Sequence, residues 1–433
     1  MKKIILFALL LSTAFPLAAQ SEYGIQFSSL LNEELTLENA IRLGLENNNK
    51  FLSAQQEIII AEQKVKEARA LFLPQLALQG TATWYNLDYP MVLPESVGNR
   101  LIPNNDSLGQ GQKHQFLSAG VSATQYLYSG GRLHNTLKAA QANLKQAQSK
   151  YEAVKNALVR DVKQAFFALL YAQQNAQLAQ TIQTKAKEYT RAMNLSAWDQ
   201  VRAQYLTSVL ISLKSAADNE LHKAQLAMLV VLNKELNSTI TVKGDFKPVQ
   251  TELDLQHLNL WSMEFRPELK AAIYALELDN LTIDLALSRR YPDLILTGTY
   301  ERLGFSELDD ENKQISLAIR LPLSYNLFTQ STQRKAEQKQ STLRRSAIED
   351  TIRVQVAENY ADMLFWQNEV LSRQNSWLEI QKSLSRAEKT TRPTIQALEA
   401  LQAYYQMGQS YYEALRHNLS AKAGLEWAIG RDL

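Results

Sequence analysis

The sequence predicts an α+β fold made mainly of long α-helices, with four short β-strands and two structural repeats. Three observations predict this fold. Residues 132–243 and 323–392 contain neither Gly nor Pro, which favours long uninterrupted helices. Four short segments alternate apolar and polar residues with the period of a β-strand. A stretch from the first half of the chain occurs again in the second half, which indicates a duplicated unit.

The N-terminal residues 1–20 are typical of a secretory signal peptide. Two lysines precede the apolar run Ile4–Leu11, and small residues lead to cleavage near Ala19 or Gln20. This run is too short to anchor the chain in a bilayer, and the alternative interpretation is a buried N-terminal helix. We therefore expect an exported protein in which any segment that crosses a membrane is a strand.

The helical regions carry apolar residues at alternating steps of three and four, as a coiled-coil seam does. The clearest seam consists of Leu398, Leu401, Tyr405, Gly408, Tyr412, Leu415 and Leu419. We expect helices over Thr36–Leu73, Arg132–Met193 and Ala197–Lys234. Asn194 and Ser196 mark a helix start in the first half, and Thr391 and Pro393 mark one in the second half.

The alternating segments begin at Gln75, Phe116, Asp293 and Gln314, and each is about the 9–11 residues that a tilted strand needs to cross a bilayer. Alone, each segment is equally compatible with a soluble antiparallel sheet; four of them in an exported chain with very long helices favour membrane strands. Four strands cannot close a barrel, because open edges in lipid leave backbone groups unpaired. The edges must pair with other copies, and two or three copies satisfy this physical argument equally well.

The duplication aligns 49–81 with 267–299, so that Ala54 matches Ala272 and Pro74 matches Pro292. It divides the chain into a first repeat at 21–243, a linker at 244–265 and a second repeat at 266–433. In the first repeat, residues 86–115 are rich in Gly and Pro and predict an exposed loop between strands.

Composition excludes several classes of function. The 433 residues carry 46 Lys and Arg against 44 Asp and Glu, so no excess positive charge favours nucleic acid as a partner. The chain has no Cys, which excludes disulfides, thiolate zinc sites and cysteine nucleophiles. The five His residues show no ligand spacing, and there is no phosphate loop or nucleophile elbow. We therefore expect neither an enzyme nor a cofactor or metal.

In its ordered motifs the chain resembles the TolC-like outer-membrane efflux protein family over essentially residues 35–430. The motifs are short, and their order and duplication carry the resemblance. They are Leu35-Thr36-Leu37-Glu38-Asn39-Ala40, Leu73-Pro74-Gln75-Leu76, Tyr128-Ser129-Gly130-Gly131-Arg132, Arg266-Pro267-Glu268-Leu269 and Tyr291-Pro292-Asp293-Leu294. Gly130 and Gly131 match the family's elbow between strand and helix, whereas Tyr325-Asn326-Leu327-Phe328 in the second repeat lacks the glycine pair.

The resemblance implies a homotrimer in the outer membrane that extends into the periplasm. Each subunit would give four strands to a shared transmembrane β-barrel, which continues into a periplasmic α-helical coiled-coil barrel. The implied function is a passive exit duct in a tripartite efflux or type I secretion system. The implied partners are a periplasmic adaptor protein, a proton-driven or ATP-driven inner-membrane pump and outer-membrane lipid. The alternative is a periplasmic coiled-coil adaptor or scaffold protein without a membrane barrel.

In the family, a segment with carboxylates just after the second helical tip narrows the periplasmic entrance. The matching segment here is 394–400, where Gln396 replaces one usual Asp and Glu399 keeps a carboxylate. Three copies of Glu399 would form a ring that favours cations; the alternative is a solvated Glu on a helix face. The first-repeat equivalents, Asp199 and Arg202, either pair with neighbouring helices to hold the tip closed or form a surface i,i+3 pair.

Overall fold

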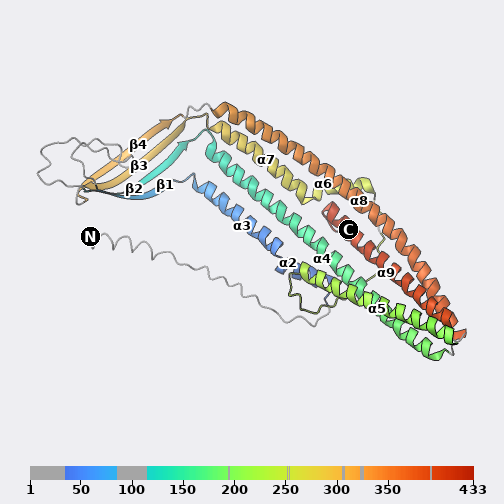
Figure 1. The fold of residues 1–433 in the computed structure, drawn as a ribbon. Helices are drawn as coiled ribbons and strands as arrows, with labels where there is room; N and C mark the ends of the chain where they lie inside the picture. Colours follow the sequence, from blue (N-terminus) through green and yellow to red (C-terminus); the bar gives the residue numbers. More distant parts are fainter. Residues whose placement is uncertain are drawn as a thin grey trace.

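The computed structural model describes residues 35–84, 115–193, 196–250, 252, 254–304, 308–321, 326–390 and 393–433, with the backbone alone for 115, 326–331 and 390. The signal peptide predicted at 1–20 and most of the loop predicted at 86–115 lie outside these residues. The described chain is elongated, with a sheet at one end and a bundle of long helices that extends away from it (Figure 1). We call the far end of this bundle the helical tip.

One four-stranded antiparallel sheet contains the strands that the alternation predicted. Its order is β1-β2-β3-β4, with bounds Gln75–Trp84, Gln115–Tyr128, Asp293–Gly304 and Asp310–Arg320. The two hairpins therefore lie side by side through the β2–β3 pair, in which Val121 is opposite Tyr300. Within the described residues, the outer edges of β1 and β4 have no strand beside them.

The helices account for most of the chain, as predicted. Those of the first half are α2 (Leu37–Asn47), α3 (Asn49–Ala70), α4 (Arg132–Ala192) and α5 (Ala197–Val231). Those of the second half are α6 (Leu255–Phe265), α7 (Pro267–Ser288), α8 (Asn326–Thr390) and α9 (Ile395–Ile429). Among the helices that the structure describes, none has an apolar stretch sufficient to cross a membrane.

One predicted helix is wrong in its extent: Thr36–Leu73 is interrupted at Asn48. The Asn48 side chain accepts hydrogen bonds from the backbone N–H groups of Lys50 and Phe51, at 3.0 and 3.3 Å. Its own backbone is extended, with φ −72° and ψ 119°. Asn favours the N-cap position because its side chain competes for such N–H groups, so a second helix begins there.

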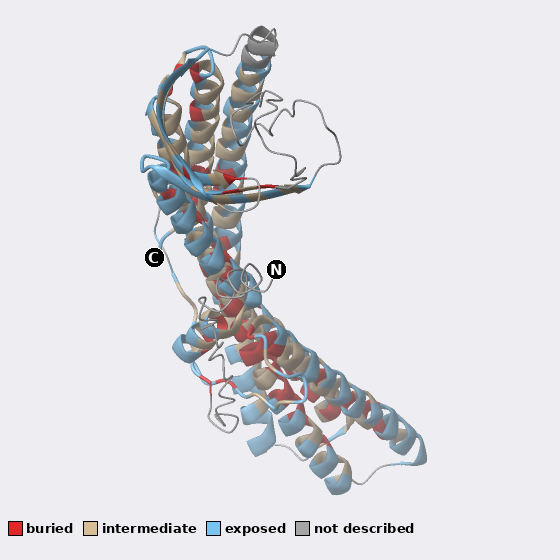
Figure 2. Ribbon diagram, turned by 90° about the vertical axis from the view of Figure 1, so that its left-hand side faces the viewer, coloured by how far each residue is buried: buried red, intermediate tan, exposed pale blue. Residues whose placement is uncertain are grey.

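The helices form one layer near the sheet and pair up towards the tip. Helices α3, α4, α7 and α8 run side by side away from the sheet, and α5 and α9 lie alongside α4 and α8 farther on (Figure 1). The buried residues follow the interior of this bundle, whereas the strands are mostly exposed or partly exposed (Figure 2). At the tip the core is formed by Ala179, Ile182, Ala203, Leu206, Leu398 and Leu401.

Candidate functional site

The sheet has two chemically different faces, because successive side chains of a strand point to opposite sides. The first face, which we call the apolar face, exposes large hydrophobic side chains such as Leu78 (79%) and Ile315 (84%). Its other exposed members include Leu76, Trp84, Leu317 and Ile319. The opposite face, the polar face, carries Gln79, Thr81, Ser118, Ser122, Thr297, Thr299, Glu301, Asn312, Gln314 and Ser316. Such a sheet suits a wall between lipid and water.

Gly130 and Gly131 form a sharp turn between β2 and α4. Both have positive φ, +59° and +82°, a conformation that is costly for residues with a Cβ. Gly130 is also confined in space, since a Cβ there would lie 2.5 Å from the Tyr291 Cβ and 2.7 Å from the Ser288 carbonyl oxygen. Gly131 is the N-cap of α4, and a Cβ there would make only an ordinary contact, 3.9 Å from the Asn135 side-chain nitrogen. The turn therefore requires glycine at Gly130 for two reasons and at Gly131 for one.

An ion pair fixes the direction in which α4 leaves this turn. The Arg132 guanidinium lies 3.0 Å from a carboxylate oxygen of Asp293, the first residue of β3. The backbone N–H of Arg132 also donates to the Ser129 carbonyl oxygen at 2.9 Å. The start of α4 is thus bound both to Ser129, the residue that follows β2, and to the first residue of β3.

At the helical tip, the structure brings together two of the four predicted residues. Arg202 on α5 donates a hydrogen bond to the carboxylate of Glu399 on α9. The pair is open to solvent, with 62% of the Arg202 side chain and 41% of the Glu399 side chain exposed. Arg202 therefore pairs across helices with Glu399.

The other two predicted residues act locally. Asp199 accepts a hydrogen bond from the Ser196 hydroxyl at 2.7 Å, and its backbone N–H donates to the same hydroxyl oxygen at 3.3 Å. Asp199 therefore belongs to the N-cap of α5, where a negative charge is favourable. The Gln396 side-chain oxygen accepts from the Thr394 hydroxyl at 2.8 Å at the start of α9.

A second polar link at the tip has no signal in the sequence. Lys185 and Tyr189 on α4 both donate to the carboxylate of Glu388 on α8, with Lys185 at 2.7 Å. Both hydrogen bonds lower the pKa of Glu388, and the one from Lys185 has the larger effect. The pKa of Tyr189 is raised mainly by burial and to a smaller extent by the hydrogen bond to Glu388. Beside this link lies a cavity of about 310 Å³, lined partly by Leu384, Ala397 and Ala400.

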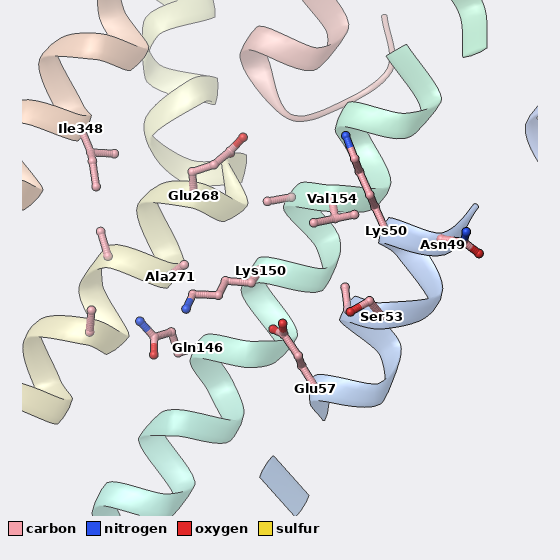
Figure 3. A pocket seen from close by; sticks show the side chains of 14 residues that line it. Asn49, Lys50, Ser53, Glu57, Gln146, Lys150, Val154, Glu268, Ala271 and Ile348 are labelled. Carbon is pink, nitrogen blue, oxygen red and sulfur yellow. The ribbon is translucent and has the colours of Figure 1, made fainter. Parts of the chain in front are cut away.

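A larger groove of about 780 Å³ lies between α3, α4 and α7. Small side chains line it, including Ala54, Ala153, Ala271, Ala272 and Ala275. Figure 3 shows Lys150 and Gln146 extending from α4 towards α7, with Glu57 on the α3 side. In the part of the chain that the structure describes, no group of three or more His, Asp or Glu side chains is arranged to hold a metal.

Comparison with known proteins gives the same architecture. The family model described as outer membrane efflux protein matches residues 40–197. The open-state MtrE outer membrane channel of Neisseria gonorrhoeae is 17% identical, with a TM-score of 0.74, and the match covers 91% of this chain and 89% of that chain. The CmeC outer membrane channel of Campylobacter jejuni is 16% identical, with a TM-score of 0.73 and coverages of 91% and 85%.

The outer membrane protein VceC of Vibrio cholerae is 13% identical, with a TM-score of 0.72 and coverages of 92% and 96%. No curated protein sequence matches the chain. At these identities the solved structures establish the fold, and the family model covers α4, both strands of the first hairpin and the start of α5. The chain therefore has the fold of these outer membrane channels, and its residues 40–197 match the outer membrane efflux protein family.

Proposed function

We propose that three copies of this chain assemble into a passive exit duct that spans the outer membrane and extends into the periplasm. One observation carries the proposal: the sheet combines an exposed apolar face, a polar face and two edges without partners in the described chain. Unpaired backbone groups at a sheet edge cannot remain in lipid, so β1 of one copy pairs with β4 of the next. Three copies supply twelve strands, enough for a lumen between them.

The helical region supports the same assembly. Helix α5 exposes Trp198 (86%) and Tyr205 on one side, and α8 exposes Leu343, Phe365 and Leu378. Large apolar side chains that remain exposed along a coiled-coil helix indicate a surface that another helix covers. In a closed ring of three subunits, helices of the neighbouring copies supply that cover.

Within this duct we assign the helical tip as the entrance that faces a periplasmic adaptor and an inner-membrane pump. Glu399, Gln396, Asp199 and Arg202 lie at the ends of α5 and α9 nearest this entrance. Because Arg202 neutralises Glu399 in the same subunit, a ring of three such pairs carries no net charge. The pairs therefore act as polar contacts that hold the tip closed, and they give little preference for cations.

Membrane fractionation followed by light scattering of the detergent-purified protein tests this function. We expect the mature chain in the outer-membrane fraction with the mass of a trimer, and stepwise ion conductance in planar bilayers. A protein that is recovered in the aqueous fraction as a monomer or dimer would contradict the duct and favour the adaptor or scaffold alternative. Cross-linking in cells then distinguishes efflux from type I secretion. A proton-driven pump among the captured partners indicates efflux, and an ATP-driven pump indicates type I secretion.

A further inference from the structure

The polar face of the sheet contains a buried acidic residue, Glu301, in the C-terminal half of β3. It is only 4% exposed. In the register of the sheet, Gln79, Gly120, Glu301 and Asn312 lie in one row across β1 to β4. The row places a small residue on one side of Glu301 and an amide on the other.

These two neighbours hold the Glu301 side chain against the sheet. A Cβ at Gly120 would lie 2.7 Å from the Glu301 Cβ, so the glycine leaves the space that the acidic side chain requires. From β4, the Asn312 side-chain amide donates to a Glu301 carboxylate oxygen at 2.8 Å. The carboxylate is therefore a fixed group, in contrast to an acidic side chain that moves freely in solvent.

The negative charge of Glu301 is not neutralised by a basic side chain of the described residues. Arg302 and Lys313 are near in sequence and register, but the alternation places both on the apolar face. There, Lys313 forms an ion pair with Glu311 at 3.2 Å. A carboxylate with little exposed surface, whose hydrogen-bond partner among the described residues is a neutral amide, favours a nearby cation.

The environment along β3 shows which side of the duct this charge faces. Thr297 and Thr299 share its face, whereas Leu296 and Tyr300 lie on the opposite, apolar face. If the apolar face contacts lipid, as the proposed function requires, then Glu301 faces the lumen. Three copies would place three fixed carboxylates at one level of the barrel wall.

We propose that Glu301 is a specificity-determining residue of the barrel, which favours cationic over anionic solutes as they leave through the outer membrane. The inference rests on the proposed duct and adds the charge class of solute that it favours. Rings of acidic side chains produce this preference in other pores. The charge preference of the duct then arises mainly in the barrel, since Arg202 already neutralises Glu399 at the tip.

Bilayer recordings of the purified trimer under a KCl gradient provide the first test. Glu301→Gln keeps the shape of the side chain and an oxygen that can accept from Asn312, and it removes only the charge. We expect the reversal potential to shift towards that of a non-selective pore. The matched control is Glu311→Gln, which removes a charge at the neighbouring register position on the apolar face. A reversal potential that is equal in wild type and Glu301→Gln would overturn the inference.

A local measurement tests the barrel even where the tip limits the current. The chain has no cysteine, so Thr299→Cys introduces a unique thiol on the face of Glu301. We expect a cationic methanethiosulfonate reagent to react faster than an anionic one, and the ratio of the two rates to fall severalfold when Glu301→Gln is added. The Glu311→Gln control should leave the ratio unchanged.

The outcomes of the thiol experiment separate the inference from the function on which it rests. A rate ratio that Glu301→Gln does not alter, in protein that still conducts ions, overturns the role of Glu301 alone. A thiol in Tyr300→Cys that reacts faster than that of Thr299→Cys would reverse the assignment of the two faces and overturn the inference as well. Protein that forms no channels in any variant contradicts the proposed duct itself.

Discussion

Each half of the chain has a junction at which the start of one helix is hydrogen-bonded to the end of another. The two junctions are equivalent in position but differ in chemistry. In the first junction, Asn48 at the start of α3 donates its side-chain amide to the Val231 carbonyl oxygen at the end of α5, at 3.3 Å. In the second junction, Arg266 precedes α7 and donates to the Ala428 carbonyl oxygen at the end of α9, at 3.1 Å. Each junction thus connects the start of one helix to the last carbonyl groups of another.

The last turns of α5 and α9 also have the same backbone geometry. Asn233 and Gly430 both have positive φ, 52° and 78°. One residue later, the Lys234 N–H donates to the Leu229 carbonyl oxygen at 2.9 Å, and the Arg431 N–H donates to Glu426 at 3.2 Å. This is the hydrogen-bond pattern of a Schellman motif, which satisfies the free carbonyl groups of a helix end.

The difference lies in charge and burial. The first junction uses neutral amides near the surface, with the Asn233 side chain also donating to the Asn47 carbonyl oxygen at 3.0 Å. The second uses a guanidinium that is 3% exposed and that also donates to Gln355 and Glu268, at 2.8 and 2.9 Å. The same backbone arrangement therefore occurs with neutral amides and with a charged guanidinium. Only the removal of the buried guanidinium should cost a large part of the folding free energy.

Replacing the N-cap residue of each junction should give the largest effect. Arg266→Ala leaves Glu268 and two carbonyl groups without their charged donor, and we expect a loss of about 3 kcal/mol in unfolding free energy. Asn48→Ala removes an ordinary helix cap and should cost about 1 kcal/mol. Guanidinium unfolding of the detergent-solubilised variants measures both. Equal losses would mean that the two junctions do not differ as their burial indicates.

The residues with positive φ give the next largest contrast. A Cβ at Gly430 would lie 2.9 Å from the Phe265 carbonyl carbon, so Gly430→Ala meets both a strained φ and a close contact. We expect it to destabilise the protein by about 2 kcal/mol. Asn233→Gly relieves the strain of a non-glycine residue but loses the two side-chain hydrogen bonds to Asn47 and Asn49, so its net effect should lie within about 0.5 kcal/mol. Thermal unfolding of the two variants in the same detergent decides whether the second junction is the more sensitive.

At the helical tip we expect a functional effect with little change in stability. The exposed Arg202–Glu399 pair should contribute at most about 1 kcal/mol to stability. Arg202→Ala exposes three uncompensated carboxylates and should increase cation preference, while Glu399→Ala should raise single-channel conductance by loosening the tip. The exchange of charges in Arg202→Glu with Glu399→Arg should restore the wild-type conductance. If both single variants have the conductance and ion selectivity of the wild type, the pair is not one of the contacts that hold the tip closed.

The smallest effect should come from acid acting on Glu388. Its pKa is lowered in the folded protein, so the link to Lys185 and Tyr189 stabilises the tip at pH above the usual Glu pKa of about 4.3 and is lost as pH falls through the lower folded value. We expect conductance to rise modestly below about pH 4. Glu388→Gln should behave at neutral pH as the acidified wild type does and should lose this pH dependence. A variant with an unchanged acid response would place the titrating group elsewhere.

The periodicity of the sequence was sufficient to predict the helices and strands but not the contacts between them. Long runs without Gly or Pro predicted α4 and α8, and alternation predicted all four strands. The interruption at Asn48 was missed, because apolar spacing continues across it while the local side-chain cap decides the break. The boundaries of the two repeats at 243 and 266 remain predictions.

The side-chain partners at the tip could be identified only from the structure. Arg202 was expected beside Asp199 or a neighbouring helix, and its partner is Glu399, about half a chain away. The link from Lys185 and Tyr189 to Glu388 was not predicted at all. Such contacts depend on how far one helix is shifted along another, and this shift is determined by packing over the whole interface, whereas the heptad pattern of one helix leaves it open.

The most direct test of the shared barrel is a cross-link between the two free edges of the sheet. In a chain without native cysteine, Thr81→Cys on β1 and Ser316→Cys on β4 place thiols on the polar face at opposite edges. Treatment of outer membranes with a short bis-maleimide should give a ladder that ends at three copies, while each single variant should give no covalent oligomer beyond two copies. A double variant that remains monomeric across several such edge pairs, or a ladder that continues past three copies, would contradict a barrel shared by three subunits.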